Sequence, residues 1–415
     1  MKLAGYKDTP HPGPLATVVG RGDSFESGFK IPLSLYIHFP WCVRKCPYCD
    51  FNSHALRGEI PEDEYVAALL RDLDLELCQF PERRPLVSIF MGGGTPSLFS
   101  GRAIARVLEG VSRRLSFAGD VEITLEANPG TAEAENFRGY RAAGVNRLSM
   151  GIQSLNDAHL KRLGRVHSSD EARRAYLLAR GAGFGNINLD LMFALPQQTP
   201  AEAEADMRGL IALQPEHISY YQLTLEPNTE FARRPPPLPD QDSAWAMQES
   251  GQQMLAQGGY GQYEVSAYAR SAALSPPTAA GYQSRHNRNY WEFGDYLGIG
   301  AGAHGKRTAG SEIRRVAKHK HPRTYLDGAG SAAGVQEIRA VSDAELPFEY
   351  AMNALRLREG FALADFERHT GRPVTLLDAG LAQARSQALV NEDNGRIRAS
   401  ETGWRFLNRL LQLFL

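Results

Sequence analysis

The chain has 415 residues, of which 43% are hydrophobic and 22% charged, and its formal net charge is -1. A chain of this length can bury a large core without disulfide bonds, and its near-neutral charge argues against a polyanionic partner such as nucleic acid. Three of its four cysteines lie between residues 42 and 49, which excludes a secreted disulfide framework and favours a reducing cytoplasm.

The first 32 residues are rich in Pro and Gly and lack the apolar core of a signal peptide. We expect a weakly ordered N-terminal leader over 1–32. No stretch of the sequence approaches the length of a membrane span, so we expect no transmembrane segment.

From residue 33, strand-like apolar runs alternate six times with helical stretches. The predicted strands read LSLYIHF, LVSIFMG, VEITLE, RLSMGIQ, INLDLMFAL and HISYYQLTL, and the predicted helices cover 62–79, 101–116, 132–143, 156–182, 201–213 and 241–257. This alternation predicts an α/β fold, a partial (β/α)6 TIM-like barrel over 33–270, with its chemistry at the carboxyl ends of the strands. The predicted N-caps are Ser100, Thr131, Ser169 and Asp240.

The remaining sequence predicts a different organisation. Residues 271–341 are expected to form a connecting region, and they contain HNRNYW and GDYLGIGAGAHG. Over 342–415, short helical stretches, the turn NEDNG and the run RIRAS predict a small winged-helix-like domain. Such domains often bind DNA, but the near-neutral charge argues against this role.

A cysteine loop, WCVRKCPYCDF, directly follows the first predicted strand. Its three cysteines are Cys42, Cys46 and Cys49. Thiolates favour iron-sulfur clusters and zinc, and three of them on a 4Fe-4S cluster leave one iron open to a small molecule. A zinc site completed by Asp50 or His54 and a set of free thiols are the alternatives. Cys78 lies in a helical run and is predicted to be a buried, small apolar residue.

Polar residues near the ends of later strands indicate a ligand site. Glycines 92–94 follow the second strand, where they permit either a close approach to a ligand or a tight turn. The two-residue period places Glu122, Thr124 and Glu126 on one face of the third strand, and Asp190 alternates with apolar residues in the fifth. A carboxylate inside a barrel either pairs with an arginine or faces a polar ligand.

The cysteine loop and MGGGTPSLF together resemble the signature of the radical S-adenosylmethionine (SAM) superfamily. This resemblance implies a 4Fe-4S cluster on the three cysteines and SAM on the open iron. Phe51 is expected to help Tyr36 and Tyr48 enclose the adenine. The SAM contacts that the resemblance implies are Tyr36, Tyr48, Gly93, Gly94, Thr95, Glu126, Gln153, Arg165 and Asp190.

Within this superfamily, LYIHFPWCVRKCPYCDF, LEANP, RLSMGIQS, LKRLGRVH and NLDLMFALP resemble the oxygen-independent coproporphyrinogen III oxidase group. Its porphyrinogen dehydrogenases carry a fourth cysteine two residues after the third, where this chain has Phe51. Phe51 and HNRNYW instead match the group's heme-chaperone branch, which is thought to deliver heme without decarboxylating porphyrinogen. SAM-dependent oxidative decarboxylation of coproporphyrinogen III is the alternative function.

The resemblance to the heme-chaperone branch also implies ligands and partners. Candidate heme-binding residues are His286, Asn287, Tyr290 and Trp291, with His304 as a competing ligand. An imidazole can serve as an axial heme ligand, although a hydrogen-bonded structural histidine is the simpler interpretation of His286. The expected partners are heme, heme-receiving apoproteins and, if SAM is cleaved, an electron donor. Peripheral membrane contact is compatible with these partners.

Overall fold

The computed structural model describes residues 31–131, 134–270 and 281–415. The predicted leader over 1–32 lies outside the described residues except for its last two. Within the described ranges, no helix is long and apolar enough to cross a membrane.

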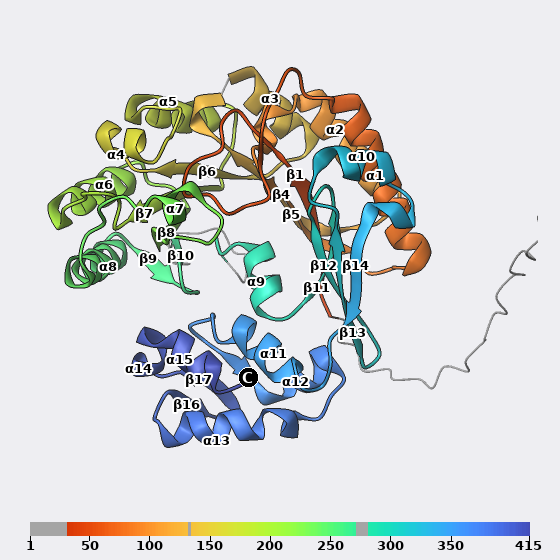
Figure 1. Cartoon of the computed structure of the whole chain (residues 1–415), viewed down its shortest axis with the longest axis vertical. Coiled ribbons are helices and arrows are strands. Elements are labelled where there is room, and N and C mark those ends of the chain that lie inside the picture. The colour runs from red at the N-terminus through yellow and green to blue at the C-terminus, as the bar shows by residue number, and fades with distance from the viewer. Residues whose placement is uncertain (1–30, 132–133, 271–280) are drawn as a thin grey trace, which may run out of the picture. The chain divides into compact units, whose positions relative to one another are not determined.

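A twelve-stranded sheet carries the fold, and six of its strands form the predicted parallel series (Figure 1). These strands are β1 (Leu33–Phe39), β4 (Leu86–Gly93), β5 (Phe117–Ala127), β6 (Arg147–Gln153), β7 (Ile187–Phe193) and β8 (His217–Gln222). Each pairs in parallel with the next. The predicted (β/α)6 partial barrel is therefore confirmed.

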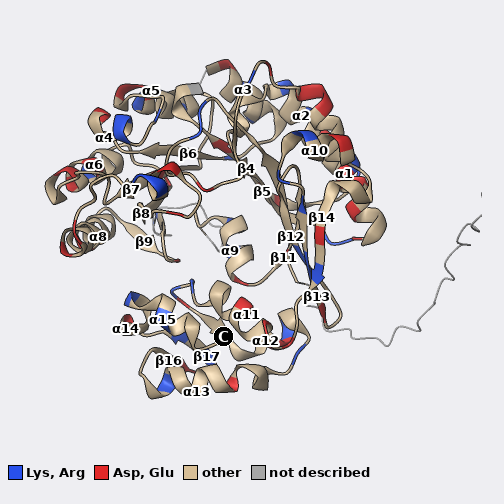
Figure 2. Cartoon of the chain, in the orientation of Figure 1, with Lys and Arg blue, Asp and Glu red and all other residues tan. Residues whose placement is uncertain are grey.

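Helices follow each of the six strands and line one face of the sheet (Figure 1). They are α1 (Glu62–Gln79), α2 (Gly101–Ser112), α3 (Ala134–Ala143), α4 (Asp157–Arg162), α5 (Ser169–Gly181), α6 (Pro200–Ala212) and α8 (Gln241–Gln257). Charged residues are frequent on these helices, and few lie on the six parallel strands (Figure 2). We call the other face of the sheet, against which α9 (Arg285–Trp291) packs, the inner face.

Further strands extend both edges of the sheet. β11 (Asp295–Ile299) pairs in parallel with β1, and β12 (His304–Ala309), β13 (Glu312–Lys318) and β14 (Val335–Ala340) continue in antiparallel fashion. At the opposite edge, β10 (Ala267–Arg270) and β9 (Tyr260–Gln262) follow β8. The described part of the stretch 271–341, which was expected to be a connection, thus contributes four strands, and within the described residues the sheet ends at β14 and β9 without closing.

Helix capping agrees with the sequence at two positions and differs at one, and the residues that directly precede α3 lie outside the described ranges. The predicted caps of α2 and α8 are confirmed, and they are Ser100 and Asp240. Ser168, rather than Ser169, caps α5, because its hydroxyl and the Glu171 carboxylate form a reciprocal capping box. Thr131 lies in the short helix η2 (Pro129–Thr131), before α3 begins.

The prediction that Cys78 is buried is wrong, since its side chain is exposed in the last turn of α1. The buried stripe of α1 includes Asp72, Leu73 and Glu76. Each residue advances about 100° around a helix, so Cys78 lies roughly 200° from Glu76 and faces solvent.

The C-terminal residues form helices around a small antiparallel sheet, in agreement with the predicted winged-helix-like domain. The helices are α11 (Leu346–Ala354), α12 (Leu363–Thr370), α13 (Asp378–Ser386), α14 (Glu401–Arg405) and α15 (Leu407–Gln412), and the strand order is β15 (Phe361–Ala362), β17 (Arg396–Ala399), β16 (Val390–Asp393). Tyr350 packs among the rings of Phe293, Phe361 and Phe366. This second core therefore includes Phe293, which precedes β11.

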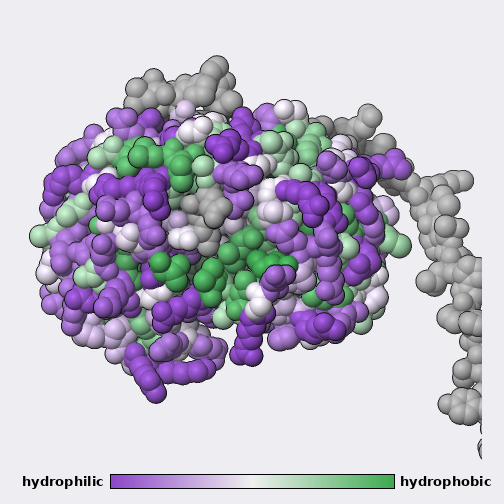
Figure 3. Space-filling view, turned by 90° about the horizontal axis from the view of Figure 1, so that it is seen from above, coloured by the Kyte–Doolittle hydropathy of each residue, from purple (hydrophilic) through white to green (hydrophobic). Residues whose placement is uncertain are grey.

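The surface mixes polar and apolar groups (Figure 3). On the face drawn in Figure 3, apolar side chains gather near the middle and hydrophilic ones border them. The exposed large apolar side chains include Phe51 on the cysteine loop and Phe406 in the C-terminal domain, at 60% and 61% exposure.

Candidate functional site

The cysteine loop leaves the carboxyl end of β1 and folds back on itself. Cys42 lies in β2 (Trp41–Cys42), which pairs with β3 (His54–Ala55), and the Leu56 N–H donates to the Cys42 carbonyl at 2.8 Å. The Cys49 N–H donates to the Cys46 carbonyl at 3.1 Å, which forms a turn between them. All three cysteines are therefore held on one short loop, with free thiols.

Polar groups surround the three thiols. Thr95 Oγ1 donates to Cys42 Sγ at 3.4 Å, Arg165 Nη1 lies 3.7 Å from Cys46 Sγ, and Cys49 Sγ lies 3.8 Å from Ser53 Oγ. Burial raises the pKa of the Cys42 and Cys49 thiols, and hydrogen bonds to their sulfurs oppose that shift. Nearby cations and donors favour the thiolate that iron requires, so this donor set fits an iron-sulfur cluster.

Across the described ranges, no three His, Cys, Asp or Glu side chains converge closely enough to hold a single metal ion. This finding concerns single ions. The thiolates that hold a 4Fe-4S cluster bind different irons, so they need not converge on one point.

Gly93 ends β4 in a conformation that requires glycine. Its φ is +107°, and a Cβ atom there would lie 2.3 Å from the His38 ring. Its N–H donates to Glu126 Oε2 at 3.0 Å. Between the two interpretations of the glycines, the structure therefore shows a tight turn packed on β1, and this turn also orients Glu126.

Gly94 and Thr95 attach the cysteine loop to the end of β4. Their N–H groups donate to the carbonyls of Phe39 and Trp41, each at 2.7 Å. A Cβ atom on Gly94 would lie 2.6 Å from the Trp41 carbonyl oxygen. The glycine run thus sets how closely the loop approaches the sheet.

Two carboxyl groups that form no ion pair within the described residues lie on the inner face near this loop, although the charge of Arg165 acts on one of them, Asp190. Among the described residues, no Lys, Arg or His forms an ion pair with Glu126 or Asp190. Burial, together with the charge of Asp190, raises the pKa of Glu126 to about 8. Burial also raises the pKa of Asp190, which accepts a hydrogen bond from Asn188 Nδ2 at 2.7 Å. Of the two interpretations, the structure favours carboxyl groups that face a polar ligand.

Arg165 and Gln153 complete the polar surroundings of the loop. Arg165 Nη2 donates to the Gly151 carbonyl at 2.7 Å, but its buried Nε has no hydrogen-bond partner in the described structure. Gln153 ends β6 with φ +70°, and its Oε1 accepts from the Tyr221 hydroxyl at 2.8 Å. An unsatisfied buried guanidinium donor fits an anionic group such as the SAM carboxylate.

The three predicted aromatic residues have different environments. Tyr36 is bonded through its hydroxyl to His38 Nδ1 at 2.7 Å, and Tyr48 packs 6.4 Å from the Phe231 ring. Phe51, in contrast, is 60% exposed. The structure thus packs Tyr36 and Tyr48 into the site and leaves Phe51 at its surface.

The motif HNRNYW forms most of α9 (Arg285–Trp291), which contacts β4, β1 and β11. The His286 ring stacks on Phe90 at 4.0 Å with an interplanar angle of 5°, and its Nδ1 lies 2.9 Å from Ser284 Oγ. Tyr290 lies 6.1 Å from His286 and packs against Tyr296 at 4.7 Å. His286 and Tyr290 therefore lie together.

The other heme-binding candidates have different neighbours. Asn287 Nδ2 lies 3.4 Å from the Tyr263 hydroxyl. Trp291 packs under the guanidinium of Arg356, 4.3 Å from the ring centre. His304 begins β12 and is exposed. The structure does not bring Trp291 or His304 to the His286 ring.

Several residues of these surroundings were not predicted from the sequence. They are His38, Ser53, Tyr221 and Phe90. His38 could have been found, because it shares one face of the strand with Ser34 and Tyr36, while the residues between them are apolar. The others depend on contacts between segments far apart in the chain.

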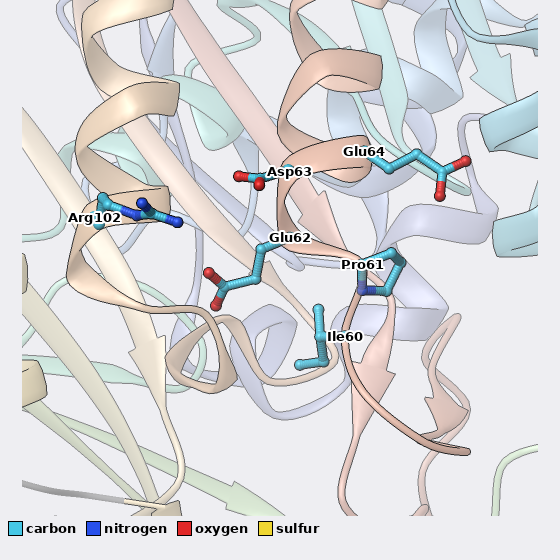
Figure 4. A pocket seen from close by; sticks show the side chains of 6 residues that line it. All are labelled: Ile60, Pro61, Glu62, Asp63, Glu64 and Arg102. Carbon is cyan, nitrogen blue, oxygen red and sulfur yellow. The ribbon is translucent and has the colours of Figure 1, made fainter.

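A surface pocket lies beside the first turns of α1 and α2 (Figure 4). It is lined by Ile60, Pro61, Glu62, Asp63, Glu64 and Arg102, none of which is a predicted site residue. The Glu62 carboxylate accepts hydrogen bonds from the Ser100 N–H and hydroxyl at 2.6 and 2.7 Å. This acidic group therefore supports the start of α2.

Two family models match the chain: the radical SAM superfamily over residues 36–210 and the HemN C-terminal domain over 341–406. Among solved structures, the coproporphyrinogen III oxidase HemN of Escherichia coli matches with a TM-score of 0.77 at 23% identity, covering 93% of this chain and 90% of that one. At this identity the likeness shows a shared fold.

Curated relatives are more similar to this chain in sequence than HemN is. The heme chaperone HemW of Haemophilus influenzae is 51% identical over 388 residues, which cover 92% of this chain and 98% of the relative. The heme chaperone HemW of Escherichia coli is 50% identical over 385 residues with the same coverage. The radical SAM superfamily implies a 4Fe-4S cluster and SAM. The chain therefore belongs to the HemW family within the radical SAM superfamily.

Proposed function

We propose that the chain is a heme chaperone that binds a 4Fe-4S cluster and SAM and transfers heme to respiratory apoproteins. The observation that carries this proposal is its likeness, over 98% of their length, to two relatives named heme chaperone HemW. Phe51, in the position where porphyrinogen dehydrogenases of the group have a fourth cysteine, supports the same function.

In this proposal the three loop cysteines hold the cluster, and Arg165 binds the SAM carboxylate through its unsatisfied Nε. The cluster and SAM together supply one-electron chemistry when bound. Glu126, with a pKa of about 8, stays protonated at pH 7 and offers a hydroxyl donor to a ligand. Thr95 hydrogen-bonds Cys42 and so orients that thiol. We propose that the other residues implied by the family resemblance also contact SAM.

His286 is the proposed axial ligand of heme. Its Nδ1 is engaged by Ser284, while Nε2 has only a longer contact of 3.5 Å with the same hydroxyl, so we assign iron binding to Nε2 of this buried imidazole, which is 8% exposed. Tyr290 would line the macrocycle beside it. Asn287 and Trp291 would support the motif through Tyr263 and Arg356.

We place this activity in the cytoplasm. Respiratory apoproteins that receive heme would bring the chain into peripheral contact with a membrane. Cleavage of SAM, where it occurs, would require an electron donor.

Heme titration of the cluster-reconstituted protein tests the proposal. We expect saturable binding with a shifted Soret band, loss of most affinity in His286→Ala, and no change in His304→Ala, which removes an exposed histidine. Unchanged binding by His286→Ala would remove that residue as the ligand. If the wild-type protein did not bind heme, the chaperone function would be refuted.

The second candidate is the oxidative decarboxylation of coproporphyrinogen III, which the fold shared with HemN favours. An anoxic assay with reconstituted protein, SAM, a reductant and coproporphyrinogen III separates the two. We expect no protoporphyrinogen IX. Product formed at a catalytic rate would replace the chaperone proposal.

A further inference from the structure

We infer that Glu122 is a positioning residue for His286, holding the imidazole so that Nε2 is presented to heme iron. The inference rests on the proposed function, and it assigns Glu122 a role that the sequence analysis did not. It is carried by the contacts that join β5, β6 and α9 on the inner face of the sheet.

Both oxygens of the Glu122 carboxylate are engaged. Oε1 accepts from the Arg285 N–H at 2.9 Å and lies 3.6 Å from His286 Nδ1. Oε2 lies 3.4 Å from Arg147 Nη1, and the side chains of Glu122 and Arg147 are 7% and 1% exposed. Because each oxygen has its own partner, the carboxylate cannot rotate away from the imidazole.

Arg147 is itself fixed in place. The same Nη1 atom donates to Asn186 Oδ1 and to the Tyr282 carbonyl, both at 3.1 Å. The position of the Glu122 carboxylate is thus determined by β6 and by the segment that precedes α9, as well as by its own strand.

The contacts of His286 favour one arrangement of its proton. Ser284 Oγ at 2.9 Å and Glu122 Oε1 at 3.6 Å both lie at Nδ1, and the ring face rests on Phe90. A carboxylate is an acceptor only, so it favours a proton on Nδ1 and leaves the lone pair on Nε2. A carboxylate behind a ligating histidine also makes the imidazole a stronger donor to the metal.

A purely structural Glu122 would only neutralise Arg147. In that case its substitution would change stability but would leave the iron-histidine bond of bound heme unchanged. The two roles are therefore separated by measurements on the bound heme.

The test compares Glu122→Gln with Asp120→Asn in cluster-reconstituted protein. Asp120 is the matched control, since it lies two residues earlier on the same strand, is 70% exposed and pairs with Arg285 Nη2 at 2.7 Å without contacting His286. We expect Glu122→Gln to weaken heme binding roughly 10- to 100-fold, the usual effect of removing such a supporting group. It should also raise the heme midpoint potential and lower the iron-histidine stretching frequency, while Asp120→Asn changes neither.

Glu122→Asp keeps the charge and should restore part of the affinity and potential. If Glu122→Gln does not fold, the double variant Glu122→Gln/Arg147→Met removes both members of the buried pair and should show the same shifts. Wild-type heme affinity and spectra in a folded Glu122→Gln protein would overturn the inference and leave the chaperone proposal standing. Absence of heme binding by the wild-type protein would refute the chaperone proposal first.

Discussion

The two ends of β5 and β6 differ in how their polar side chains are satisfied. Toward the amino ends, Glu122 and Arg147 bind each other and the residues of α9. Near the carboxyl ends, Glu126 has no basic partner among the described residues, and Arg165 keeps a buried nitrogen that has no hydrogen bond within the same ranges. We call these regions the paired end and the open end.

The difference indicates at which end a bound ligand would supply the most missing hydrogen-bond partners. Buried polar groups are rarely left without partners, because each one costs about 1 to 3 kcal/mol. At the paired end the chain supplies partners for the Glu122 carboxylate and for Arg147 Nη1, while Arg147 Nη2 and Thr124 Oγ1 lack one within the described residues. At the open end, next to the three cysteines, the missing partners are those that a charged, polar cofactor would provide.

The largest expected effect is the loss of the cluster at the open end. Replacing Cys42, Cys46 or Cys49 by Ser should abolish the cluster, whereas Cys78→Ser, at an exposed site on α1, should retain it. Iron and acid-labile sulfide analysis after anaerobic purification measures both. A full complement of iron in any of the three variants would contradict the assignment, and zinc in place of iron would support the zinc alternative.

The next prediction concerns how much the paired end contributes to the free energy of unfolding. Arg147→Met leaves the Glu122 carboxylate buried without its cation, which should lower the free energy of unfolding by about 3 to 5 kcal/mol. Arg285→Met, which breaks the exposed pair with Asp120, should cost less than about 1 kcal/mol. Urea denaturation measures both, and similar losses would show that the paired end does not depend on this contact.

A smaller effect tests ligand binding at the open end. Arg165→Gln should weaken SAM binding by about 1.5 to 3 kcal/mol, because the bond to an ionised group is lost. Arg162→Gln, three residues earlier and exposed, is the control and should bind normally. Calorimetric titration is done after cluster content is matched, since Arg165 also contacts Cys46. Equal affinities would exclude Arg165 from the SAM site.

The last effect is gradual rather than a single loss, and it is the pH dependence of the ligand-free protein. The pKa of Glu126 is about 8 in the folded chain against an ordinary value of 4.5, so the folded state binds more protons between these values. Stability should therefore fall as pH rises from about 5 to 8, by at most about 1.4 kcal/mol per pH unit from this group. Glu126→Gln should flatten that slope in urea denaturation, and parallel slopes would contradict the raised pKa.

Local patterns predicted much of the fold. The bounds of β1, β6, α1 and α8 agree with the sequence, because strand alternation and helix periodicity are read within a few residues. β11 to β14 were missed as part of the sheet. Glycines lie close to all four, and their place in the sheet depends on the pairing of β11 with β1, which lies far away in the sequence.

The candidate site was predicted only in part, because local patterns indicate some of its residues and contacts between distant segments place the others. The cysteine loop and the ends of β4, β5 and β7 carry their polar residues in recognisable local patterns. The contact of Glu122 with α9 spans 163 residues, and no local pattern indicates such a pairing. The stacking of His286 on Phe90 is equally non-local.

The parallel pairing of β11 with β1 has a consequence for biosynthesis. Leu33 pairs with Asp295, about 260 residues later in the chain. At usual rates of translation, the strand that precedes the cysteine loop waits roughly 13 to 50 s for its second neighbour to leave the ribosome. Until then β1 is an unprotected edge strand. Insertion of iron and sulfur into a settled loop is therefore expected late in synthesis or after it, and the nascent chain has a long period in which chaperones can bind.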